Sequence, residues 1–108
     1  MSGTQTPYAY QYETVAASAT AQVLGGTGAI GDYVHRLIVS NVTVATASVT
    51  LIDGSTSIVL QTGAATLVTG VASIEVNARS STGPWKITTG AGATVVAVGI
   101  FSAYGLSQ

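Results

Sequence analysis

Residues 23–39 read VLGGTGAIGDYVHRLIV, and this stretch decides the class of fold. Gly26, Gly28 and Gly31 have the G-x-G-x-x-G spacing of a dinucleotide-binding loop, and Asp53 lies where a ribose-binding carboxylate would follow. Such a loop needs a helix directly after its last glycine, because the helix N-terminus supplies the amide groups that hold pyrophosphate. The fold class therefore depends on the residues that follow Gly31.

Those residues favour a strand. Valine, isoleucine and threonine, which are stiff at the first side-chain torsion and common in strands, recur through residues 34–44. We therefore predict a glycine-rich turn that leads into a long strand from Asp32 to about Val42, with a nucleotide-binding loop as the alternative. Regular alternation would give this strand two faces, one with Tyr33, His35, Leu37 and Val39 and the other with Asp32, Val34, Arg36, Ile38 and Ser40.

The other apolar runs are also short and separated by turn residues. Residues 53–55, Asp-Gly-Ser, predict a hairpin turn at which the Asp53 carboxylate bonds nearby backbone amides. Residues 71–79 alternate, with even-numbered side chains inward, and residues 94–103 are apolar on both faces, as in a central strand. The predicted fold is a single antiparallel all-β sandwich, jelly-roll-like or a small barrel, with about seven to eight short strands. The further expected strands are 21–24, 48–52, 56–61 and 85–88.

The chain has 108 residues, which predicts one domain, and only 6% of them are charged. A soluble domain usually carries about a quarter charged residues, and a monomer relies on mixed surface charge to stay soluble. A surface of serine, threonine, glycine and alanine therefore indicates that much of it faces other protein. We expect a subunit of an assembly.

Composition also argues against several partners. The net charge is −1 and the three basic residues are scattered, so we expect no nucleic-acid partner. The chain has no cysteine, residues 1–12 do not resemble a secretory signal, and residues 87–108 have a strand-like rather than a membrane-helix pattern. Neither export by the secretory route nor a membrane partner is expected.

Residues 1–14 are predicted to form a flexible or docking N-terminal arm, and residues 15–108 the β-sandwich domain. Tyr8, Tyr10 and Tyr12 alternate, so an extended chain would place three rings on one side, where they could contact a neighbouring protein. A disordered tail, or an edge strand of the chain's own sheet, is the alternative.

The sequence contains no motif that indicates a catalytic site. His35 is the one histidine, there is no G-x-S-x-G nucleophile elbow, and the four carboxylates show no paired arrangement. No histidine, cysteine or carboxylate cluster has metal-ligand spacing. We therefore predict no enzyme, no catalytic residues, no cofactor, no metal and no small-molecule substrate.

Three further residues are candidates for contacts with partners. Arg36 and Arg79 could each bind a carboxylate across a subunit boundary, or could pair within the chain with Asp32 or Glu75. Trp85 could stack on a sugar ring, although a single tryptophan at the start of a strand is more often part of a sandwich core.

Several short sequence motifs resemble those of small virion structural proteins of tailed bacteriophages. In order, they are Gly31-Asp32-Tyr33 with Arg36-Leu37, then Asp53-Gly54-Ser55, Ala78-Arg79-Ser80 with Gly83, the run from Trp85 to Ala91, and Val98-Gly99 with Phe101. The chain departs from this pattern at Ile52, where such proteins often have lysine, and the tyrosine-rich leader lies outside the resemblance.

The resemblance implies a capsid decoration or cement protein, a non-enzymatic β-sandwich subunit on the outer surface of the virion. Its implied partners are the major capsid protein and further copies of itself, as a homotrimer. A receptor- or glycan-binding module of a phage fibre or tail is the alternative function.

Overall fold

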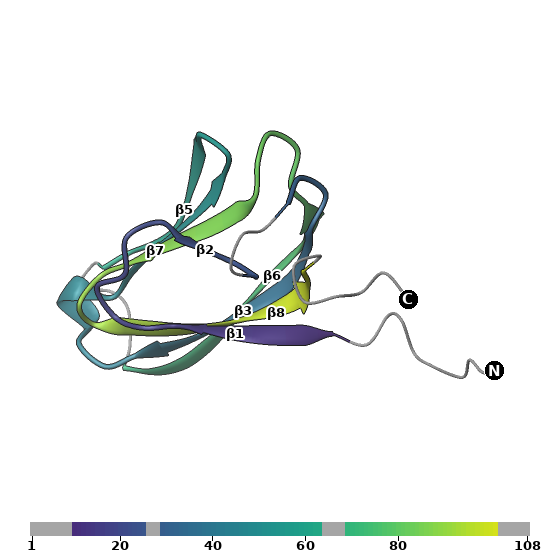
Figure 1. Cartoon of the computed structure of the whole chain (residues 1–108). Helices are drawn as coiled ribbons and strands as arrows, with labels where there is room; N and C mark the ends of the chain where they lie inside the picture. The colour runs from purple at the N-terminus through teal and green to yellow at the C-terminus, as the bar shows by residue number, and fades with distance from the viewer. Residues whose placement is uncertain (1–9, 26–28, 64–68, 102–108) are drawn as a thin grey trace.

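The computed structural model describes residues 10–25, 29–63 and 69–101. They form two four-stranded antiparallel sheets packed face to face, the upper and lower layers of Figure 1. The all-β sandwich predicted from the sequence is confirmed. Its elements are β1 (Gln11–Val15), β2 (Gln22–Val23), β3 (Tyr33–Asn41), the 3-10 turn η1 (Val44–Thr46), β4 (Ser48–Asp53), β5 (Thr56–Thr62), β6 (Gly70–Arg79), β7 (Trp85–Thr89) and β8 (Ala93–Ile100).

The strand order is β1-β8-β3-β6 in one sheet and β2-β7-β4-β5 in the other. β8 lies between β1 and β3, as expected of a strand that is apolar on both faces. Alternate side chains of β8 enter the core, and those between them lie on the opposite face of the sheet. The largest fully buried side chains are Phe101, Leu24, Leu37, Leu51, Ile87, Val15, Val34, Val39, Val49 and Val95.

β4 and β5 form the predicted hairpin. Asp53 is opposite Thr56, which leaves Gly54 and Ser55 as a two-residue turn. Gly54 has φ +64, a value that glycine adopts without a steric penalty. In β6 the even-numbered side chains from 72 to 78 are partly buried and the odd-numbered ones are exposed, which confirms the predicted alternation.

The Asp53 carboxylate does bond backbone amides, but not those of its own turn. It accepts hydrogen bonds from the N–H groups of Ser81 and Thr82, each at 3.0 Å, in the loop between β6 and β7. The Thr82 hydroxyl donates to the Asp53 carbonyl at 2.7 Å. Asp53 therefore joins two loops that are 28 residues apart, and the local arrangement expected from the sequence is wrong.

These amide donors hold the pKa of Asp53 below its ordinary value, and the Thr82 N–H makes the largest contribution. A lowered pKa in the folded state means that the ionised carboxylate stabilises folding above about pH 3.9, and that this contribution disappears as the pH falls through the folded pKa. We expect Asp53→Asn to lower the free energy of unfolding at neutral pH, and the difference from wild type to shrink in acid. Urea unfolding from about pH 6 to pH 3 measures this.

Glu75→Gln is the control, because Glu75 lies on the exposed surface and bonds no loop amide. A difference between Asp53→Asn and wild type that stays constant over the same pH range would contradict the role of the charge.

Coincident β-bulges bend the sheet that contains β3. Val34 and Arg36 of β3 pair with the consecutive residues Gly99 and Val98 of β8, so His35 is an extra residue in β3. The same two residues pair with Ala78 and Glu75 of β6, so β6 has one extra residue relative to β3. A bulge inserts an unpaired residue, and in β3 the side-chain alternation reverses after it. Strand β5 has a further bulge at Leu60, where its register against β4 shifts.

The bulge corrects the predicted faces of β3. Val34 is buried with Leu37 and Val39, while Tyr33 and Arg36 share the opposite side. Strict alternation placed Val34 and Leu37 on different faces, because it did not include the extra residue at His35.

The first described residues belong to the sheet. Gln11–Val15 form edge strand β1, paired with β8, so the edge-strand alternative describes this part of the expected arm. The Gln11 side chain also accepts a hydrogen bond from the N–H of Phe101 at 2.9 Å. Tyr8 and the rest of residues 1–9 lie outside the described residues, as do residues 102–108.

The residues after Gly31 form strand β3 and not a helix. The structure therefore lacks the helix N-terminus that a dinucleotide loop requires at this position. Gly26 and Gly28 lie outside the described residues. Within the described ranges, no helix is long and apolar enough to cross a membrane.

Candidate binding surface

Four of the predicted interface residues lie on one surface. We call the solvent side of sheet β1-β8-β3-β6 the outer face. Arg36 and Arg79 lie on it, from β3 and β6, and Tyr10 and Tyr12 lie at its β1 edge. Tyr10 is 50% exposed and Tyr12 is 70% exposed.

Trp85 does not belong to this surface, so its assignment as an interface residue is wrong. It is only 3% exposed within the core, and its indole N–H donates to the carbonyl of Asp32 at 2.8 Å. A tryptophan becomes buried when its ring can pack and its N–H finds an acceptor, and both conditions hold here. The core interpretation is confirmed, and the ring presents no face on which a sugar could stack.

The two arginines have partners within the chain. Arg36 lies 3.7 Å from the Glu75 carboxylate, the intrachain pairing considered from the sequence. An exposed pair of this kind contributes about 1 kcal/mol at most, so it does not prevent Arg36 from meeting another group. Arg79 donates to the Gly31 carbonyl at 2.9 Å, and its guanidinium lies 5.8 Å from the centre of the Tyr33 ring.

A cluster of rings occupies the end of the outer face at which β3 begins. The rings of Tyr10 and His35 stack with their centres 4.6 Å apart. The centre of the Tyr33 ring lies 6.2 Å from that of the Tyr10 ring. The Asn77 side-chain oxygen accepts a hydrogen bond from the Tyr33 hydroxyl at 3.0 Å and lies 2.8 Å from His35 Nδ1. An oxygen acceptor at this distance places a proton on Nδ1. The cluster thereby connects Tyr10, which directly precedes β1, with residues of β3 and β6 across β8.

Asn77 lies in the β6 bulge, and from there its side chain contacts both Tyr33 and His35. Its φ is +49, in the left-handed region where asparagine is among the few tolerated side chains. The alternation of residues 71–79 predicts an outward-facing Asn77 but no role for it. An asparagine within an otherwise regular alternating strand is a sign of a bulge, and it could have identified this position.

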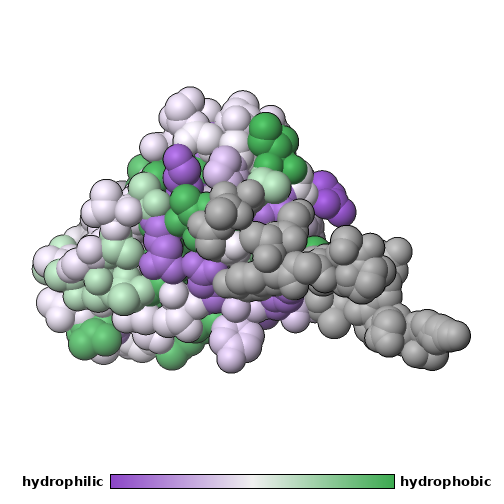
Figure 2. All heavy atoms as spheres, in the orientation of Figure 1, coloured by the Kyte–Doolittle hydropathy of each residue, from purple (hydrophilic) through white to green (hydrophobic). Residues whose placement is uncertain are grey.

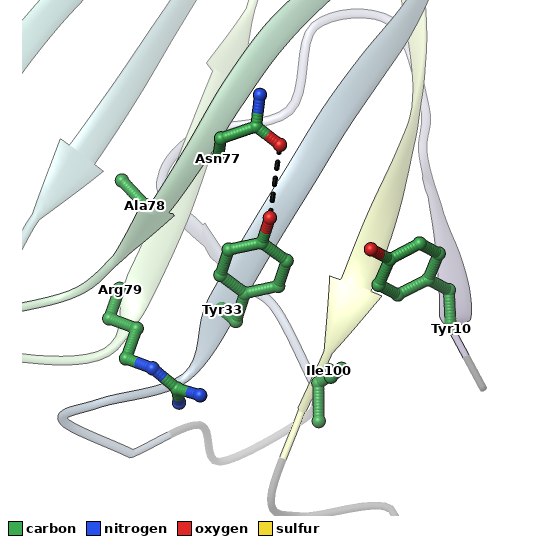
Figure 3. A pocket seen from close by; sticks show the side chains of 6 residues that line it. All are labelled: Tyr10, Tyr33, Asn77, Ala78, Arg79 and Ile100. Carbon is green, nitrogen blue, oxygen red and sulfur yellow. Dashed lines mark hydrogen bonds between the residues drawn. The ribbon is translucent and has the colours of Figure 1, made fainter. Parts of the chain in front are cut away.

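The bend in the sheet leaves an aromatic groove beside the cluster. Its volume is about 370 Å³. Figure 3 shows Tyr10 reaching over β8 toward Tyr33, with Arg79 on the other side of the Tyr33 ring. The lining residues are Tyr10, Tyr33, Asn77, Ala78, Arg79 and Ile100.

The surroundings of Tyr33 raise the pKa of its phenol above the ordinary value. Partial desolvation is the main cause, followed by the neighbouring Tyr10, while the Arg79 cation acts in the opposite direction. The hydroxyl is therefore neutral at physiological pH and remains a hydrogen-bond donor to Asn77.

The other end of the outer face has aliphatic and hydroxyl side chains. We call it the aliphatic patch. Half-buried valines and an isoleucine lie at its centre, and Val71 at its edge is 73% exposed. Its residues are Ile38, Val71, Val96 and Val98, with Thr14, Ser40, Ser73 and Thr94.

Near-neutral side chains cover much of the visible side of the molecule in Figure 2, and strongly hydrophilic ones gather near its middle. The prevalence of near-neutral side chains agrees with the low charge of the sequence. Such a surface has little charge with which to repel a protein partner.

Two further carboxylates accept hydrogen bonds from groups of the chain itself. Glu13 accepts hydrogen bonds from the Gln22 side chain and the Gly25 N–H, both at 2.7 Å. Asp32 is buried and accepts from the Ala29 N–H at 3.1 Å. Among the described residues, no group of three histidine, cysteine or carboxylate side chains could hold a metal ion.

No protein family, curated protein or solved structure matches the chain.

Proposed function

We propose that this chain is a non-enzymatic virion structural protein, a capsid decoration or cement protein that binds the outer surface of a bacteriophage head. The aliphatic patch is the observation that carries the proposal. It presents exposed and half-buried β-branched and hydroxyl side chains from four adjacent strands in a protein with only seven charged residues. The resemblance of short sequence motifs, such as Gly31-Asp32-Tyr33, to those of phage virion proteins supports the same proposal.

The mechanism is adhesion. Burial of apolar surface between the patch and neighbouring subunits supplies the free energy, and permanent interfaces of this type commonly bury about 2,000 Å² or more. The partners are the major capsid protein and further copies of the chain, in a homotrimer. A subunit bound across capsid subunits would stabilise the head against internal pressure.

Substitution of a residue of the aliphatic patch by lysine tests this function. We expect Val96→Lys to abolish binding to phage heads that lack the protein, because the interface would have to bury an unpaired charge. Val59→Lys is the matched control, since Val59 is 60% exposed on strand β5 of the other sheet. Light scattering gives the mass of each protein alone, and co-sedimentation with heads gives its occupancy.

Wild-type trimers that bind heads, with Val96→Lys defective and Val59→Lys normal, are the expected result. Circular dichroism must show that both variants are folded. A monomer that binds no heads, or a folded Val96→Lys protein that binds them normally, would contradict the proposed function. Deletion of residues 1–9, which leaves β1 intact, tests whether the leader contributes to occupancy.

A further inference from the structure

The aromatic groove is separate from the aliphatic patch. It lies where β3 begins and where β6 and β8 end, while the patch extends toward the opposite ends of these strands. A partner on the patch can therefore leave the groove open to solvent.

The apolar part of the groove can contact the face of a ring. Tyr10 stacks on His35 with one face and is still 50% exposed, so its ring retains open surface. Ile100 from β8 lies between Tyr10 and Tyr33, as Figure 3 shows. Aromatic and aliphatic surfaces in this arrangement suit the C–H face of a saturated ring.

The polar part of the groove supplies hydrogen-bond donors. The Asn77 side-chain oxygen is occupied by Tyr33 and His35, whereas its amide nitrogen has no hydrogen-bond partner in the described part of the chain. Arg79 uses one terminal nitrogen for the Gly31 carbonyl and retains further N–H groups. A guanidinium pairs best with a planar anion such as a carboxylate.

Charge and size limit the ligand further. Among the described residues that line the groove, Arg79 alone is charged, which gives this part of the groove a positive sign. The volume of about 370 Å³ is at the lower end of the range for ligand pockets and suits a single ring rather than an extended chain.

We propose that the aromatic groove binds an acidic sugar unit, a pyranose ring with a carboxylate. Tyr10 and Ile100 contact the ring face, Arg79 binds the carboxylate, and the Asn77 amide donates to a ring hydroxyl. This site is independent of the virion role, because none of these residues belongs to the aliphatic patch. It places carbohydrate recognition at a position that does not involve Trp85.

Titration with methyl β-D-glucuronide, followed by NMR of the Asn77 side-chain amide and the Arg79 Nε–H, tests the site. We expect saturable shifts, with affinity at least about tenfold higher than for methyl β-D-glucoside, which lacks the carboxylate. Acetate, which lacks the ring, should bind at least about tenfold more weakly as well. A glucuronate-containing tetrasaccharide shows whether the unit is recognised within a glycan or only as the free sugar.

The chain offers two matched pairs of variants. Arg79→Gln and Tyr10→Ala should each weaken glucuronide binding about tenfold or more, whereas Arg36→Gln and Tyr12→Ala, on the same face but outside the groove, should not. Absence of saturable shifts, equal binding of acetate and glucuronide, or equal loss in the matched controls would overturn the site. Loss of head binding in Val96→Lys has no bearing on this result, so the two proposals can fail separately.

Discussion

Replacement of Trp85 by alanine should lower the free energy of unfolding by about 3–5 kcal/mol, the range observed when a buried aromatic residue is truncated. Trp85 is 3% exposed at the start of β7, where its ring fills the core between the sheets. Alanine would leave a cavity and remove the 2.8 Å hydrogen bond to the Asp32 carbonyl. A domain of this size commonly has a stability of about 5–15 kcal/mol, so the variant would lose a large part of it.

Urea unfolding followed by circular dichroism measures this effect without depending on tryptophan fluorescence. Trp85→Phe helps to separate the two contributions, because it keeps a six-membered aromatic ring in the core and loses the N–H donor with the rest of the indole. We expect it to cost less, since the Asp32 carbonyl also accepts the Ser80 N–H at 3.0 Å. Tyr12→Ala, at a 70% exposed position, should change stability by no more than about 0.5 kcal/mol. A Trp85→Ala protein as stable as Tyr12→Ala would refute the core assignment.

Replacement of Gly99 by alanine should destabilise the sandwich by about 3 kcal/mol, the upper part of the range for overpacking. A β-carbon at this position would overlap the carbonyl oxygen of Tyr33 and lie 3.0 Å from the Val34 Cα. Both are backbone atoms of the adjacent strand, which cannot rotate away as a side chain could. Relief would require separation of β8 from β3 at the bulge.

Thr94→Ala is a suitable comparison, because Thr94 lies on the outer face of β8 and the substitution removes atoms rather than adding them. Its effect should be within about 0.5–1 kcal/mol. Thermal and urea unfolding of the two variants under the same conditions give the difference. If Gly99→Ala unfolds at the same urea concentration as wild type, the close approach of the two strands at the bulge is not a constraint.

Much of the fold could be predicted because local patterns and tertiary packing agree. The Gly54 turn, the alternation of β6 and the apolar central strand β8 each follow from short-range rules of turn chemistry and side-chain period. Aromatic residues at the starts of strands were harder to assign. The sequence favoured a core position for Trp85, yet only the structure shows the carbonyl that accepts its N–H.

The candidate binding surface could be predicted less well, because it depends on register. The β-bulges reverse the faces of β3 after His35 and bring Tyr33, Arg79 and Asn77 to one end of the outer face. Such contacts depend on how strands that are 40 or more residues apart in the sequence pair with each other. A local sequence pattern does not contain this register. The partners of Asp53 illustrate the same limit, since the residues it bonds are in a distant loop.

The bulges at Leu60 in β5 and beside Asn77 in β6 also affect how the molecule behaves when it is crowded. Both are in edge strands, whose unpaired backbone groups could otherwise join the strands of other copies into a continuous fibril. With so few charges, the chain has little electrostatic repulsion to prevent this growth. The interrupted edges of β5 and β6 hinder such strand addition on their side of each sheet.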